Sequence, residues 1–180
     1  MPERYVEVPP QNVRIAWNEI TRQTVENRLV RGSIRGIKVD EAEKPLPGAV
    51  FGLFAEGTTE FVENAAFAVA ESSEDGSFSF ENIPYGMWLV REMKTSAGYV
   101  LSGEIFEVRI TGNNVVIELG NLENKPVTGE LELTKLDIST GKSLPNAGFR
   151  IKDAEGNTVV EGYTDEHGIA RFTLGYGEYT

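Results

Sequence analysis

The sequence feature that most constrains the fold is an internal repeat with a constant offset of 97 residues. Residues Val25–Asp40 match Leu122–Asp137, and each copy reads Glu-Asn and a basic residue, then a glycine, then Lys, an apolar residue and Asp. A period of this length corresponds to a whole domain, because the units of solenoid proteins span only about 20 to 45 residues. The chain is therefore predicted to contain tandem copies of one domain.

The match continues past a loop of slightly different length, where Leu46–Phe51 pairs with Leu144–Phe149. In this register residues 1–30 form the C-terminal remnant of a preceding repeat, 31–127 form a complete unit, and 128–180 are the truncated N-terminal part of the next repeat. Only the middle unit is expected to contain all of its strands, and whether the two ends fold is left open.

The pattern of side chains predicts short strands throughout the complete unit. Apolar and polar residues alternate with period two between turns rich in Gly, Asn and Asp, and a helical turn within 60–70 is considered but not favoured. The predicted strands are Ser33–Asp40, Ala49–Ala55, Ala66–Glu71, Ser77–Glu81, Met87–Met93, Ile105–Thr111 and Val115–Leu122. Seven strands in under 100 residues predict an all-β fold, an antiparallel immunoglobulin-like or prealbumin-like β-sandwich repeated in tandem.

Composition excludes several classes of function. Lys and Arg total 17 against 28 Asp and Glu, a net charge of −11 that repels nucleic acid and anionic lipid surfaces. No apolar run is long enough to cross a bilayer, and the first ten residues lack a secretion leader, so we expect a piece of a longer protein. The absence of cysteine excludes thiol catalysis, thiolate metal sites and disulfides.

Two polar residues fall on the core face of predicted strands, and a third, Asn124, continues the core face of the last one two residues beyond its end. Lys38, Glu92 and Asn124 each alternate in phase with the apolar residues of their own strand. Burial of an isolated charge is costly, so such groups neutralise, pair or react.

This set of residue types predicts amide chemistry. Burial lowers the pKa of an amine and raises that of a carboxyl in general. A neutral amine is a nucleophile, and a neutral carboxyl can hydrogen-bond an amide oxygen, polarise it and pass a proton to departing ammonia. Because fixed proximity supplies effective molarities of roughly 10⁵ M or more, Lys38 and Asn124 are predicted to form a side-chain amide. The protein would react once with itself and would not be an enzyme acting on outside substrates.

The complete unit resembles the collagen-adhesin B-type (Cna B, prealbumin-like) repeat domains of Gram-positive cell-wall-anchored adhesins and pilins. The residues that carry the resemblance are Ile37–Asp40, Leu46–Phe51, Asp75-Gly76, Tyr85-Gly86, Val90–Glu92, Gly98-Tyr99 and Glu123–Lys125. It implies an isopeptide bond between Lys38 and Asn124 assisted by Glu92, and a structural stalk or shaft displayed at the cell surface or cell wall. One departure is Thr95-Ser96-Ala97, where such domains usually have Ala-Pro-Glu, and it lies in a predicted loop.

Other assignments of the same residues remain open from the residues alone. Lys38 would extend its ammonium to solvent, Glu92 would only form an ion pair with it, and Asn124 would cap a strand. Asn121, in phase with Ile117 and Leu119, is the fallback acceptor.

The repeat also assigns two orphan partners to the incomplete units. Asn27 corresponds to Asn124 and would be the acceptor of the preceding unit, and Lys135 corresponds to Lys38 and would be the donor of the next. We expect neither to be cross-linked within this chain.

An adhesive module that recognises a host protein or glycan, through loops such as 56–65, is the alternative function, and neighbouring repeats are the other expected partners. No cofactor or metal is predicted. The single histidine, His167, lies in a predicted turn, and Asp137, Asp153 and Asp165 lie at separate turns without the spacing of a calcium loop.

Overall fold

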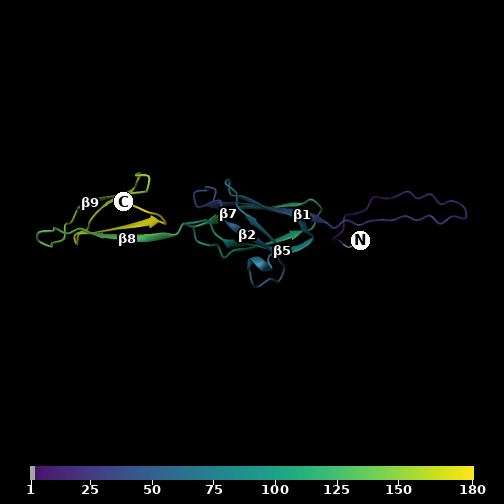
Figure 1. The fold of residues 1–180 in the computed structure, drawn as a ribbon, viewed down its shortest axis with the longest axis horizontal. Helices are drawn as coiled ribbons and strands as arrows, with labels where there is room; N and C mark the ends of the chain where they lie inside the picture. The colour runs from purple at the N-terminus through teal and green to yellow at the C-terminus, as the bar shows by residue number, and fades with distance from the viewer. Residues whose placement is uncertain (1–2) are drawn as a thin grey trace. The chain divides into compact units, whose positions relative to one another are not determined.

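The computed structural model describes residues 3–180, which divide into two compact units (Figure 1). Unit 1 contains the chain up to Ser96 together with Leu101–Asn124. Unit 2 contains Ala97–Val100 and Lys125–Thr180. No helix among the described residues is long and apolar enough to cross a membrane.

Unit 1 contains every strand that the alternation predicts, with ends that differ by at most three residues. Its strands are β1 (Arg31–Asp40), β2 (Val50–Ala55), β3 (Ala68–Glu71), β4 (Ser77–Pro84), β5 (Gly86–Lys94), β6 (Ile105–Ile110) and β7 (Val116–Asn124). They form a three-stranded sheet of order β4-β1-β7 and a four-stranded sheet of order β3-β2-β5-β6. The two sheets pack face to face, as expected for a β-sandwich.

The core lies between these sheets because each strand sends alternate side chains inward. It contains Ile34 and Phe78 from one sheet and Phe51, Val90 and Ile110 from the other. The rings of Phe51 and Phe78 stack with a centroid distance of 3.9 Å, which joins β2 to β4 across the sandwich.

Two features of unit 1 differ from the sequence expectation. The first strand, β1, pairs in parallel with the last, β7, so the sandwich is not antiparallel throughout. Strand periodicity gives the face of each side chain but not the order or direction of neighbours. In addition, Glu63–Ala65 forms one turn of 3₁₀ helix in the segment where a helical turn was not favoured.

A β-bulge interrupts the β1–β7 pairing. Arg35 lies opposite Glu118 but Ile37 lies opposite Asn121, so β7 contains one more residue than β1 over this stretch. Gly120 takes a positive φ of 73° there, a conformation that glycine adopts at little cost. The extra residue reverses the inward and outward alternation for the rest of β7.

Unit 2 has a smaller core. Its strands β8 (Thr128–Thr134) and β11 (Ile169–Gly175) form one antiparallel pair, and β9 (Gly148–Lys152) and β10 (Thr158–Tyr163) form another. Its buried apolar residues are Ile151, Ala170, Phe172 and Leu174.

The segment before β1 is a long two-armed loop (Figure 1). Its arms are joined near their base by a bridge between Tyr5 and Leu29, and Val6 N–H donates to the Arg28 carbonyl. Several apolar side chains beyond this base are exposed, among them Ile15 and Trp17.

Candidate functional site

Lys38, Glu92 and Asn124 meet inside unit 1 although they come from three strands. Lys38 lies on β1, Asn124 at the end of the neighbouring strand β7, and Glu92 on β5 of the opposite sheet. Their exposed fractions are 1%, 2% and 3% for Lys38, Asn124 and Glu92 respectively. Burial at these positions follows the strand alternation, and for Asn124 it depends on the bulge at Gly120.

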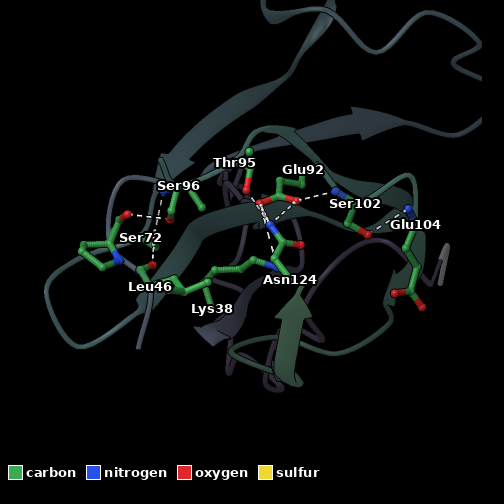
Figure 2. A network of polar contacts seen from close by, with 11 residues as sticks. Lys38, Leu46, Ser72, Glu92, Thr95, Ser96, Ser102, Glu104 and Asn124 are labelled. Carbon is green, nitrogen blue, oxygen red and sulfur yellow. Dashed lines mark hydrogen bonds and ion pairs between the residues drawn. The ribbon is translucent and has the colours of Figure 1, made fainter. Parts of the chain in front are cut away.

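The three side chains point toward one another (Figure 2). Lys38 Nζ lies 3.9 Å from Glu92 Oε1. Asn124 Nδ2 donates to Glu92 Oε1 at 2.8 Å and lies 3.0 Å from Oε2. The amide nitrogen of Asn124, and not its oxygen, therefore faces the carboxyl group, which differs from the oxygen contact considered from the sequence.

Asn124 Oδ1 is buried and has no hydrogen-bond partner among the described residues. An unpaired buried carbonyl oxygen typically costs about 1 to 3 kcal/mol, and such atoms are few in folded proteins. The side chain of Asn124 is therefore held in a costly state in which only its nitrogen is satisfied.

The electrostatics of the site shift the protonation equilibrium of Lys38 toward the neutral amine. Burial lowers the pKa of Lys38 below its ordinary value of 10.5, and the negative charges of Glu92, Glu104 and Glu123 oppose that shift. At 3.9 Å the ammonium and carboxylate are farther apart than in a tight ion pair, so their attraction offsets only part of the desolvation.

Backbone contacts hold Lys38 and Glu92 in place. Lys38 N–H donates to the Gly76 carbonyl at 2.7 Å, and the Lys38 carbonyl accepts from Leu46 N–H at 2.9 Å. Glu92 Oε2 accepts a hydrogen bond from Ser102 N–H at 2.9 Å. Because these partners belong to turns and loops, the strands alone do not define the site.

Thr95 and Ser96 contribute to the site, although the sequence predicted only that they lie in a loop. Thr95 Oγ1 accepts a hydrogen bond from Asn124 Nδ2 at 2.7 Å. Ser96 is buried, and its hydroxyl donates to the Pro47 carbonyl at 2.7 Å. The departure from the usual Ala-Pro-Glu sequence was the only signal in the chain that could have drawn attention to them.

The two units share a hydroxyl contact that the sequence did not predict. Ser72 donates to the Leu46 carbonyl at 2.7 Å and accepts from Ala49 N–H at 2.9 Å. In unit 2, Thr164 makes the same two contacts, at 2.7 Å and 2.8 Å, with the counterparts Leu144 and Ala147. Each unit thus uses a hydroxyl to fix the chain as it enters its second strand.

The other residues singled out from the sequence lie apart from this cluster. Asn121 is exposed and lies opposite Ile37, on the outward side created by the bulge. Asn27 is exposed in the N-terminal loop. Lys135 follows β8 and is also exposed, although it alternates in phase with Leu131 and Leu133 and corresponds to the buried Lys38 in the repeat.

The histidine and the three aspartates considered as possible metal ligands lie at turns. His167 is exposed beside Glu166. Asp137 and Asp165 accept backbone N–H groups of their own turns, which lowers the pKa of each carboxyl. Asp153 accepts hydrogen bonds from the side-chain amide of Asn157 and from its backbone N–H, which lower the pKa of that carboxyl. In residues 3–180 no group of three or more His, Asp or Glu side chains is arranged to hold a metal ion.

Comparisons with known proteins identify the fold. The family model described as the SpaA prealbumin-like fold domain matches residues 32–124 and 129–180, which confirms the predicted all-β, prealbumin-like fold. The Bacillus anthracis TIE protein is 38% identical over 86% of this chain, with a TM-score of 0.73. The match covers 28% of that chain, so the present sequence spans less than a third of its relative.

More distant solved structures are pilins. BcpA, the major pilin subunit of Bacillus cereus, is 15% identical with a TM-score of 0.44 over 83% of this chain and 86% of its own. A streptococcal ancillary pilin is 22% identical with a TM-score of 0.47 over 89% of this chain and 58% of its own. No curated protein matches the chain.

Proposed function

Because the chain belongs to the family of SpaA prealbumin-like fold domains, we propose that it is a structural stalk or shaft segment of a Gram-positive surface adhesin or pilin. Unit 1 is rigidified by an isopeptide bond between Lys38 and Asn124 that folding itself produces with the help of Glu92. The observation that carries this proposal is the burial of an amine, a carboxyl and a carboxamide, with the amine and the carboxamide both next to the same carboxyl group.

The reaction balances without any outside reagent. Lys38 first gives its extra proton to Glu92, and the neutral Nζ then attacks Asn124 Cγ. One proton passes from Nζ to Nδ2 through Glu92 as the bond between Cγ and Nδ2 breaks, and ammonia leaves. The contact at 2.8 Å between Glu92 Oε1 and Nδ2 supports this route, because it places the proton donor at the leaving nitrogen.

The products are better suited to a dry core than the reactants. A buried ammonium and carboxylate are replaced by a neutral amide and a neutral carboxyl group, which removes two charges from the interior. The protonated carboxyl can then donate to an amide oxygen, the kind of atom that is unpaired in Asn124. Both changes favour completion of the reaction.

The bond also constrains the unfolded chain. It closes a loop of 87 residues, from 38 to 124, and by analogy with disulfides stabilises the folded unit by about 4 to 5 kcal/mol. Unlike a disulfide it cannot be reduced, and this chain contains no cysteine. Such a unit suits a stalk exposed to proteases and shear at a cell surface.

We also propose that the chain contains parts of three repeats, 1–30, 31–127 and 128–180. The two family matches, 32–124 and 129–180, support the second boundary. The sequence Val13-Arg14-Ile15 repeats Val108-Arg109-Ile110 of β6, and Ile110 is fully buried whereas Ile15 is 75% exposed. Ile15 thus has no core to pack into here, although its counterpart Ile110 lies in one. This supports the assignment of 1–30 to the last two strands of a preceding repeat.

The test is the intact mass of the purified chain under denaturing conditions. We expect the parent to lack one molecule of ammonia, and a Glu92→Ala variant to have its full mass. A tryptic digest should also join the peptide that contains Lys38 to the one that contains Asn124. A parent with its full mass would overturn the cross-link and would favour the alternative, an uncross-linked adhesive domain.

A further inference from the structure

The turn that follows β5 contacts the proposed acceptor directly. Thr95 Oγ1 lies 2.7 Å from Asn124 Nδ2, within the same unit. Ser96 fixes this turn, because its buried hydroxyl donates to the Pro47 carbonyl at 2.7 Å. Thr95 is therefore held against the amide nitrogen by a neighbour with a partner of its own (Figure 2).

The hydrogen bonds of Asn124 Nδ2 account for both of its N–H groups. One donates to the carboxyl group of Glu92, at 2.8 Å and 3.0 Å from its two oxygens, and the other to Thr95. A planar amide with both N–H groups bound cannot rotate about its last side-chain bond without breaking them. Thr95 and Glu92 together thus fix the plane of the group that Lys38 attacks.

The Thr95 contact also suits the leaving group. In the proposed route Glu92 supplies the third hydrogen of ammonia, and Thr95 Oγ1, at 2.7 Å, accepts one of the two N–H groups that Nδ2 already has. Because these N–H groups become better donors as the nitrogen is protonated, an acceptor already in position stabilises the transition state more than the starting amide.

We propose that Thr95 is a further functional residue of isopeptide formation, which orients the Asn124 amide and accepts a hydrogen bond from the departing ammonia. The inference rests on the proposed function, because it concerns the same reaction. It gives a role to one of the three residues at which this chain departs from the usual sequence of similar domains.

The experiment measures the rate of bond formation. Each chain is recovered unfolded from inclusion bodies, refolded by dilution, quenched in acidic urea at successive times and weighed as an intact chain. Thr95→Val preserves the shape of the side chain and removes the acceptor, so we expect ammonia loss to slow about tenfold. Thr95→Ser keeps the hydroxyl and should react within about twofold of the parent rate.

Two controls separate chemistry from folding. Far-ultraviolet circular dichroism should recover at the same rate in the parent and in Thr95→Val, and Thr95→Ala replaces that variant if it does not refold. Ser96→Ala should slow the reaction less than Thr95→Val, because it loosens the turn and leaves the acceptor present. Equal rates of ammonia loss in the parent and in a folded Thr95 variant would overturn this inference alone. A parent that never loses ammonia would overturn the cross-link together with it.

Discussion

Lys38 and Asn124 lie on adjacent parallel strands but are two residues out of register, since Lys38 is opposite Leu122 and Asp40 is opposite Asn124. A lysine side chain is long enough to bridge this offset, whereas directly opposed residues would leave it folded back on itself. The geometry thus matches a long donor and a short acceptor, and it depends on the pairing of β1 with β7.

Removal of the acceptor should destabilise unit 1. We expect Asn124→Ala to keep its full mass and to lose about 4 to 5 kcal/mol of unfolding free energy, because its unfolded chain is no longer closed into a loop. Urea denaturation measures the change. Asn121→Ala is the matched control, since this exposed side chain should contribute less than about 0.5 kcal/mol. Equal losses in the two variants would contradict the assignment of the acceptor.

The lowered pKa of Lys38 predicts an alkaline effect on stability when the bond is absent. In Asn124→Ala the folded state binds fewer protons than the unfolded state between the lowered pKa of Lys38 and its ordinary value of 10.5. The free energy of unfolding should therefore rise as the pH increases through this window. Denaturation at several pH values measures the effect, and the double variant Lys38→Met, Asn124→Ala should lack this rise. Parallel pH profiles in the two would show that Lys38 is charged in the folded protein.

A glycine beside the donor should tolerate no side chain. Gly76 has a positive φ of 76°, and a Cβ there would lie 2.3 Å from the Lys38 carbonyl oxygen. Gly57 has a similar φ of 83° with no atom within 4 Å of such a Cβ. Gly57→Ala should cost about 1 to 2 kcal/mol from backbone strain alone. Gly76→Ala should lower the unfolding free energy clearly more than Gly57→Ala and should slow ammonia loss, because β1 must move at Lys38. Thermal unfolding and intact mass measure the two effects. Equal stability and equal rates of ammonia loss in the two variants would contradict a role for this contact.

Limited digestion with trypsin should separate the N-terminal loop from unit 1. Arg14, Arg22 and Arg28 are exposed in a segment held by few backbone hydrogen bonds, whereas Val30 and Ile34 are buried. We expect cleavage at these arginines first, and a resistant product that still lacks one ammonia. Early cleavage between β1 and β7 would argue against a rigid unit.

Much of this site could be predicted because strand alternation and the repeat are local properties of the sequence. They placed Lys38 and Glu92 on the core face and indicated which asparagine corresponds to Asn27. Alternation alone also offered Asn121, and it failed there because Gly120 adds a residue that reverses the phase. A bulge depends on the backbone conformation of a single residue, and the periodicity of apolar side chains carries no information about that conformation.

The remaining differences arise from tertiary contacts. Thr95 and Ser96 were given little weight because a loop has no periodicity that fixes where its side chains lie, yet their hydroxyls contact Asn124 and Pro47. Lys135 shows the converse, since its position after β8 is exposed although its counterpart Lys38 is buried. In both cases the burial and the contacts of the side chain depend on which segments pack against it, and the local sequence does not specify these segments.

The parallel pairing of β1 and β7 has a mechanical consequence. Because the two strands run the same way, the start of β1 and the end of β7 lie at opposite ends of the sheet, so a pull on the chain shears them along their length. With Lys38 bonded to Asn124, the 85 residues from 39 to 123 lie outside the path of the force. Stretched, they would release roughly 290 Å of chain at about 3.4 Å per residue. If the proposed bond forms, this length of chain is not released under tension, so the unit would bear load without extending.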